Sequence, residues 1–398
     1  MANKPLQTIL FGSPGTGKSN RIKTKIIPNN LNIDDQSNII TTVFHPEYTY
    51  GDFMGKLMPL TDSDQKVSYR YYTGHFLKAL GKAYSNIIDS YLGYDEEKKS
   101  TLNSYKREIK KGNQEYFTEE EKQELEQRYS SIQRQEPENV VLVIDELNRG
   151  NSAAIFGIVF QLLDRNKKGW SEYSTTISDL EKVGLLEEIG FSTYYEVERD
   201  NTEEKYKYKG NSCSRSQYEK YMEYIFDDLE FDDRISLLDN KIKMPPNLSV
   251  LATMNTSDNS IYFMDNAFKR RWDWEFINID DYNQRNEVKE RKIKPSTGNA
   301  VPWADFVDRL NQFICDPSHK IRKVEDKQIG YFFINEDIIT EEQIKNKLMF
   351  FVWDSVFSSN RDPLAQLLEI KKGELVTFGQ FTRKAPTFIE KIMNWNNV

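Results

Sequence analysis

Short runs of apolar and β-branched residues recur along the chain, with segments of helical character between them. Four of these runs are typical of strands, and we expect them in a parallel sheet: residues 6–11, 39–44, 140–144 and 248–253. Helices are expected over about residues 18–27, 77–89 and 152–163. Strands that alternate with helices in this way predict an α/β fold.

Two long polar stretches interrupt this pattern. Residues 94–138 are dominated by Lys, Glu, Gln and Tyr, and a capped, charged helix is expected to begin at Thr118. We interpret this stretch as an inserted helical hairpin. Residues 164–243 are similarly polar, and we expect helices and a hairpin there, with contacts to partners or nucleic acid left open. The remaining pattern predicts an α/β core over residues 1–280 and a helical lid with a C-terminal segment over 281–398.

One segment carries a specific chemical signature. Residues 12–19 read G-S-P-G-T-G-K-S and fit the phosphate-binding P-loop pattern G-x-x-x-x-G-K-[ST], between an expected strand and an expected helix. Glycines allow backbone angles that turn successive N–H groups toward phosphates, and Lys18 and Ser19 are placed for the outer phosphates and Mg²⁺. The predicted phosphate-binding residues are Gly12, Ser13, Pro14, Gly15, Thr16, Gly17, Lys18 and Ser19. The alternative is a glycine-rich turn that fits by chance.

Two carboxylates follow the most apolar of the expected strands. Asp145 and Glu146 come directly after the run at residues 140–144, which is the Walker-B pattern. Asp145 is then placed to hold Mg²⁺, directly or through water, and Glu146 to orient and activate the attacking water. The alternative is a pair of ordinary loop acids.

Further polar residues follow the last expected strand. Asn255 stands at its tip, where a side-chain amide can hydrogen-bond the attacking water or the γ-phosphate, although turns also favour Asn. Arg270 and Arg271 end a short helix. Guanidinium groups stabilise charge on a transferring phosphoryl group, and in ring-forming NTPases they act across the subunit interface. The alternative is that these cations only complement the C-terminal end of a helix.

Composition narrows the possible partners and the compartment. The net charge is −8, so a broad basic surface for nucleic acid is not evident, while a local basic patch or pore stays possible. Two cysteines and three histidines show no metal-ligand spacing, and sparse cysteines suit a reducing cytoplasm. We see no secretory signal and no run of about 20 apolar residues, so we expect a cytoplasmic protein without membrane contact.

Six segments, in order, resemble the McrB family of AAA+ motors, the NTPase subunits of modification-dependent restriction systems. They are residues 12–19, 45–53, 144–151, 254–260, 267–271 and 329–332. The resemblance implies an AAA+ core that hydrolyses GTP or ATP with Mg²⁺. It also implies a homo-oligomeric, hexameric ring and a McrC-like nuclease subunit that docks on the ring. Contact with DNA would be made through that complex.

The segment at residues 254–260 reads M-N-T-S-D-N-S, and the family usually has M-N-T-A-D-R-S. Asn255 and Asp258 are retained, and the resemblance assigns both to the catalytic machinery. Asn259 replaces the usual Arg, which puts the coupling of this loop to an activating partner in question. The P-loop also begins at Gly12, so we expect target recognition in an insertion or on a partner.

Two other functions remain open from the sequence. A MoxR-like AAA+ chaperone would share the P-loop, the Asp-Glu strand and the lid, and the neighbouring gene would distinguish the two. A nucleotide-switched scaffold that does not hydrolyse is the second alternative, and the retention of Asp145 and Glu146 argues against it. The choice between GTP and ATP, the ring size and the recognised DNA are not decided.

Overall fold

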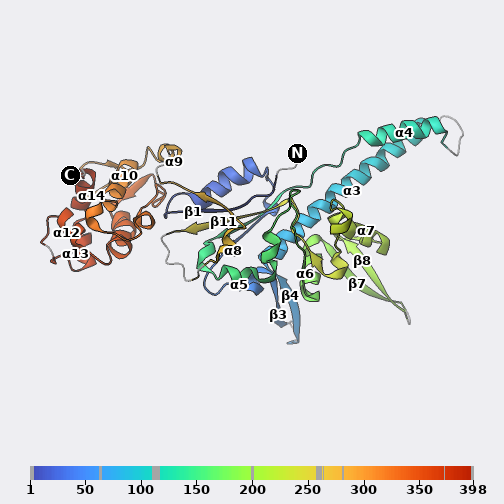
Figure 1. Cartoon of the computed structure of the whole chain (residues 1–398), viewed down its shortest axis with the longest axis horizontal. Coiled ribbons are helices and arrows are strands. Elements are labelled where there is room, and N and C mark those ends of the chain that lie inside the picture. The colour runs from blue at the N-terminus through green and yellow to red at the C-terminus, as the bar shows by residue number, and fades with distance from the viewer. Residues whose placement is uncertain are drawn as a thin grey trace. The chain divides into compact units, whose positions relative to one another are not determined.

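The computed structural model describes residues 4–61, 65–109, 117–198, 201–256, 262, 264–279, 282–371 and 373–395 (Figure 1). The chain divides into two compact units. The first comprises Met1–Gln7, Ile26–Leu251 and Tyr262–Trp272, and the second comprises Thr8–Lys25, Ala252–Ile261 and Asp273–Val398. Residues 12–19 lie in the second unit, and the expected domains over 1–280 and 281–398 stay a prediction.

A five-stranded parallel sheet is the centre of the α/β fold, and its strand order is β12-β1-β11-β5-β2. Its strands are β1 (Gln7–Gly12), β2 (Ile39–Val43), β5 (Val140–Asp145), β11 (Leu248–Asn255) and β12 (Asp273–Phe276). The four strands expected from the sequence are therefore confirmed. Strand β12, which pairs with β1 in parallel, was missed, because it is short and mostly exposed.

Burial explains why the central strands are so apolar. Every residue from Val140 to Ile144 in β5 is buried, and so are the first six residues of β11. A strand covered on both faces cannot alternate with polar residues, so it reads as a continuous apolar run. Strand β2 pairs with β5 in parallel, with Thr42 opposite Ile144.

The first unit contains seven α-helices among its described residues: α2 (Tyr50–Phe53), α3 (His75–Ile109), α4 (Glu119–Ser131), α5 (Ser152–Phe156), α6 (Asp179–Ile189), α7 (Arg215–Phe226) and α8 (Asn266–Lys269). Helix α3 runs on through the expected break near residue 90. Helix α4, capped by Thr118 and Glu121 as expected, lies along its outer half (Figure 1). A hairpin of β3 (Gly55–Thr61) and β4 (Val67–Thr73) was not predicted.

The second polar stretch folds into its own small elements. Helices α6 and α7 flank the antiparallel sheet of β7 (Phe191–Glu198), β8 (Asn201–Tyr208) and β9 (Asn211–Cys213), and β6 (Thr175–Thr176) pairs with β10 (Lys241–Ile242). Helix α6 packs closely on α3, where the backbone of Gly81 lies against Glu188. The interpretation of this stretch as an insertion stays a prediction.

The second unit begins its helical content at α1 (Lys18–Arg21), which leads into a π-helical segment (Ile22–Asn30). Its other α-helices among the described residues are α9 (Tyr282–Glu287), α10 (Trp303–Ile314), α11 (Glu341–Gln343), α12 (Asp362–Leu367), α13 (Phe378–Thr382) and α14 (Ala385–Met393). Two π-helical turns lie at Ile344–Met349 and Val352–Val356. A small sheet of β13 (Lys292–Lys294), β14 (Val301–Pro302) and β15 (Ile338–Thr340) was not predicted.

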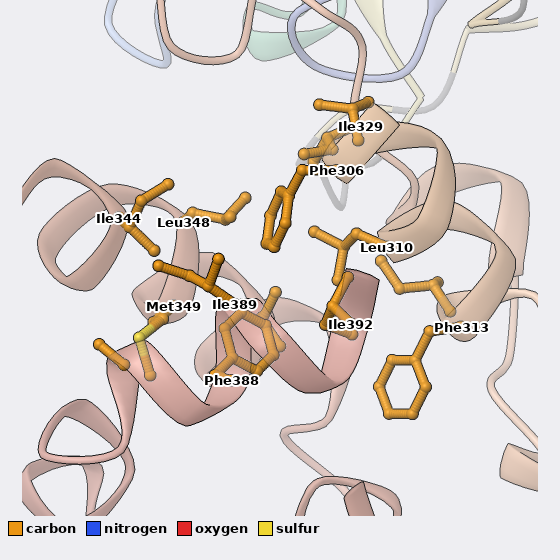
Figure 2. Close-up of a cluster of buried hydrophobic side chains, with 14 of the residues drawn as sticks. Phe306, Leu310, Phe313, Ile329, Ile344, Leu348, Met349, Phe388, Ile389 and Ile392 are labelled. Atoms are coloured by element: carbon orange, nitrogen blue, oxygen red, sulfur yellow. The ribbon is translucent and has the colours of Figure 1, made fainter. Parts of the chain in front are cut away.

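Side chains from α10 and α14 meet in the core of this helical part. Figure 2 shows Phe306 and Leu310 of α10 gathered with Ile389 and Ile392 of α14, all fully or almost fully buried. No helix among the described residues is both long enough and apolar enough to cross a bilayer.

Candidate functional site

The predicted P-loop connects strand β1 to helix α1, as the sequence indicated. Gly15 and Gly17 have φ angles of 76° and 74°, in the left-handed region that favours glycine. The loop is also held from within, because the Thr16 hydroxyl donates to the carbonyl oxygen of Ser13 at 3.0 Å. The sequence of the loop therefore matches the backbone conformation that it adopts.

Lys18 is buried inside this loop. Its Nζ donates to the carbonyl oxygens of Gly12 and Ser13 at 3.0 and 2.9 Å, and it lies 3.4 Å from the hydroxyl of Thr16. A lysine side chain at this place supplies a cation that would attract an anion to the loop. Ser19 follows on the exposed face of α1.

The end of strand β11 meets the start of the P-loop. The backbone N–H of Thr256 donates to the carbonyl oxygen of Gly12 at 3.3 Å. Asn255 is the last residue of β11, so the contact places the adjoining backbone at the loop, while the expected role of the Asn255 side chain stays a prediction. Asp258 falls outside the described residues, and its role stays a prediction.

A segment far along the chain also contacts the P-loop. The N–H groups of Gly330 and Phe332 donate to the carbonyl oxygens of Pro14 and Gly15 at 2.8 and 2.9 Å. From the sequence, residues 329–332 were noted only for their family resemblance. A glycine directly before three aromatic residues was the one available signal of a close backbone contact.

The two carboxylates of the Walker-B pattern lie in the first unit, at the end of β5. Asp145 is the last residue of the strand, and Glu146 follows with a φ of 56°, which only a minority of non-glycine residues adopt. Both side chains are partly buried. Residues held in such sparsely populated conformations cluster at functional sites. The conformation of Glu146 is thus consistent with a catalytic role, which stays a prediction.

The two adjacent arginines have different surroundings. Arg271 pairs with Asp164 through Nε and Nη2, at 3.0 and 2.6 Å, and its guanidinium lies 4.0 Å from the ring centroid of Phe160. Its side chain is only 8% exposed, whereas Arg270 is exposed. The expected role in a neighbouring subunit's site therefore suits Arg270 in this structure, while Arg271 is engaged inside its own chain.

The residues expected to bind Mg²⁺ offer suitable oxygen atoms. Within the described part of the chain, no group of three or more His, Cys, Asp and Glu residues is arranged to hold a metal ion. Magnesium in phosphate sites commonly takes only one or two protein ligands together with phosphate and water oxygens. The Ser19 hydroxyl and the Asp145 carboxylate are donors of this kind. The binding of Mg²⁺ itself remains a prediction.

Comparison with known proteins finds a similarity to a restriction enzyme component. No protein-family model matches the chain. The chain is similar to component YdiS of the type II restriction enzyme BsuMI from Bacillus subtilis (strain 168), with 27% identity over 380 residues. The matched region covers 89% of this chain and 80% of that protein.

Proposed function

We propose that this chain is a Mg²⁺-dependent NTPase motor, resembling the McrB branch of AAA+ proteins, that works in a restriction system. The observation that carries the proposal is the predicted P-loop, in which two left-handed glycines, Gly15 and Gly17, precede the buried Lys18. Backbone N–H groups and a cation gathered in one loop between a strand and a helix form a binding site for phosphates. The similarity to a named restriction enzyme component supports the biological setting.

Each residue has a proposed task in hydrolysis. Lys18 and the loop N–H groups bind the outer phosphates, and Lys18 exchanges its present carbonyl partners for phosphate oxygens. Glu146 orients the attacking water and accepts its proton, while Asn255 hydrogen-bonds that water or the γ-phosphate. Mg²⁺, held by Ser19 and Asp145, would neutralise charge on the phosphates.

Assembly and partners form the second part of the proposal. Arg270 is exposed at the end of α8 and would complete the site of a neighbouring subunit in a ring, for which we propose six subunits. Turnover would then depend on assembly. A McrC-like nuclease subunit would dock on the ring, and DNA would be reached through that complex. The proposal covers either GTP or ATP as the substrate.

Steady-state phosphate release from GTP and from ATP tests the enzymatic proposal. Wild-type chain should hydrolyse at least one of them with Mg²⁺, and Lys18→Ala and Glu146→Gln should each abolish release. Glu146→Gln should still bind the nucleotide, because only the group that activates water is changed. Equal turnover in all three proteins would refute the assigned mechanism.

The partner proposal has an independent test. The product of the adjacent gene should co-purify with the chain only when a slowly hydrolysed nucleotide analogue is present, and size-exclusion chromatography should show a ring under that condition. A partner with a nuclease active site supports restriction. A metal-binding partner of the von Willebrand type would favour a MoxR-like chaperone instead.

A further inference from the structure

The contact between the P-loop and residues 329–333, here called the bracing segment, involves backbone on both sides. Gly330 and Phe332 donate their N–H groups to Pro14 and Gly15, two consecutive peptide units of the loop. In a trans peptide the C=O and the following N–H point in opposite directions. Fixing the Pro14 and Gly15 carbonyls toward the bracing segment therefore turns the N–H groups of Gly15 and Thr16 away from it.

The packing leaves no room for side chains at this contact. A Cβ on Gly330 would overlap the carbonyl oxygen of Gly15, and a Cβ on Gly15 would overlap the backbone of Phe333. At Gly17, a Cβ would lie 3.0 Å from the ring of Phe332. The Ser13 hydroxyl adds a hydrogen bond of 2.8 Å to the carbonyl of Glu325, just before the segment. The loop therefore contacts the segment at Pro14, Gly15 and Gly17.

Helix α10 holds the other side of the bracing segment. The Asn311 side chain both donates to the Ile329 carbonyl at 2.8 Å and accepts from the Ile329 N–H at 3.0 Å, and all of these groups are buried. The Trp303 indole donates to the Tyr331 carbonyl at 2.7 Å. Figure 2 shows the Ile329 side chain beside Phe306 of the same helix, inside the core.

We infer that the bracing segment sets the conformation of the phosphate-binding loop, with Gly330 and Asn311 as positioning residues for nucleotide binding. The inference rests on the proposed function only in taking a nucleotide as the ligand. The contacts between the loop and the bracing segment are observed independently of that function. Without the segment, the loop would have to order its own peptide units when phosphate binds, which costs conformational entropy. With it, two N–H donors are oriented in advance, and that orientation is transmitted from α10 through backbone hydrogen bonds.

Substitution of Gly330 by alanine tests the contact directly. Gly330→Ala places a methyl group against Gly15 without backbone strain, because Gly330 does not have a positive φ. The added methyl group should push the backbone of Gly15 out of place. The Kd for a fluorescent GTP or ATP analogue with Mg²⁺ should therefore rise about tenfold or more. Gly379→Ala is the matched control: it lies in α13 with nothing near its Cβ, and its Kd should stay within about twofold of wild type.

A second pair of variants separates positioning from stability. Asn311→Ala removes both side-chain bonds to Ile329, and the Kd should again rise several-fold. Val307→Ala, also in α10, removes a buried methyl pair from the core and should lower the melting temperature without changing the Kd. If Asn311→Ala changes the melting temperature only, as Val307→Ala does, the inference is wrong.

A readout without nucleotide distinguishes the inference from the proposed function. The rate at which an amine-reactive ester labels Lys18, followed by mass spectrometry, reports whether its ammonium is still enclosed by the loop. Labelling should be at least about fivefold faster in Gly330→Ala and Asn311→Ala than in the two controls. Unchanged labelling would overturn the inference, even if nucleotide binds. If wild-type chain binds no nucleotide, the proposed function fails, and the labelling rates still decide the inference.

Discussion

The ion pair between Arg271 and Asp164 should contribute strongly to the stability of the first unit. Two hydrogen bonds join the guanidinium to Asp164 Oδ2, and a third, from Nη1, reaches the carbonyl of Ala267 at 2.9 Å. The Arg271 side chain is 8% exposed and that of Asp164 is 30% exposed. Asp164→Asn removes the charge but keeps an amide oxygen in place. The variant therefore leaves a nearly buried cation without its counter-charge.

The magnitude follows from that burial. Removing one partner of a buried pair typically costs about 3–5 kcal/mol, and because Asp164 is partly exposed we expect about 2 kcal/mol here. For a folding unit of this size, such a loss lowers the melting temperature by about 4–8 °C. Replacing the pair by Asp164→Asn with Arg271→Met should recover part of the loss, because Met packs against Phe160 without a charge.

Thermal unfolding followed by circular dichroism measures the effect. Asp305→Asn is the matched control, because it makes the same change at an exposed pair, and Arg285 keeps Asp308 as a second partner at 3.1 Å. Its cost should be below about 1 kcal/mol. If Asp164→Asn melts within about 1 °C of wild type, Arg271 is not anchored inside the chain, and its assignment to a neighbouring subunit's site becomes the better one.

Three further predictions concern the active residues and acid stability. Arg270→Ala should abolish turnover. Mixing it with Glu146→Gln should restore a fraction of the rate, because each chain supplies the group that the other lacks across a subunit interface. If the mixture of these two inactive variants stays inactive, a site shared between subunits is refuted. Glu146→Gly should be more stable to urea than Glu146→Ala by about 1 kcal/mol, because glycine adopts a φ of 56° without strain, and equal midpoints would contradict this. Burial among aromatic rings lowers the pKa of His319, so its neutral form is favoured in the folded state and stability is lost as the pH falls through its ordinary value near 6.5. His319→Phe should therefore flatten the decline of melting temperature between about pH 7.5 and 5.5, leaving the part due to His75, whose pKa burial also lowers.

Much of the sheet and of the phosphate loop could be predicted from the residues alone. Strand β5 and the loop at residues 12–19 depend on neighbours in the sequence: a run of apolar residues, and glycines at fixed spacing before a lysine. Strand β12 and the β3–β4 hairpin were missed, because their exposed, mixed residues carry little hydrophobic signal. The length of α3 was also underestimated, since its outer half is polar and is paired with α4.

By itself the sequence determined the α/β class and the glycine-rich backbone of residues 12–17, because local spacing dictates backbone conformation there. The phosphate chemistry of that loop and of Asp145 and Glu146 stays a prediction. Only the tertiary structure decided which of two adjacent residues of the same type is buried. Arg270 and Arg271 are adjacent in sequence, yet one is exposed and the other is enclosed by Asp164 and Phe160. Likewise, the contact of Gly330 with Pro14 joins backbone groups more than 300 positions apart. Nearly every residue carries the same backbone donor and acceptor, so the sequence of side chains does not predict which distant carbonyl accepts from which N–H.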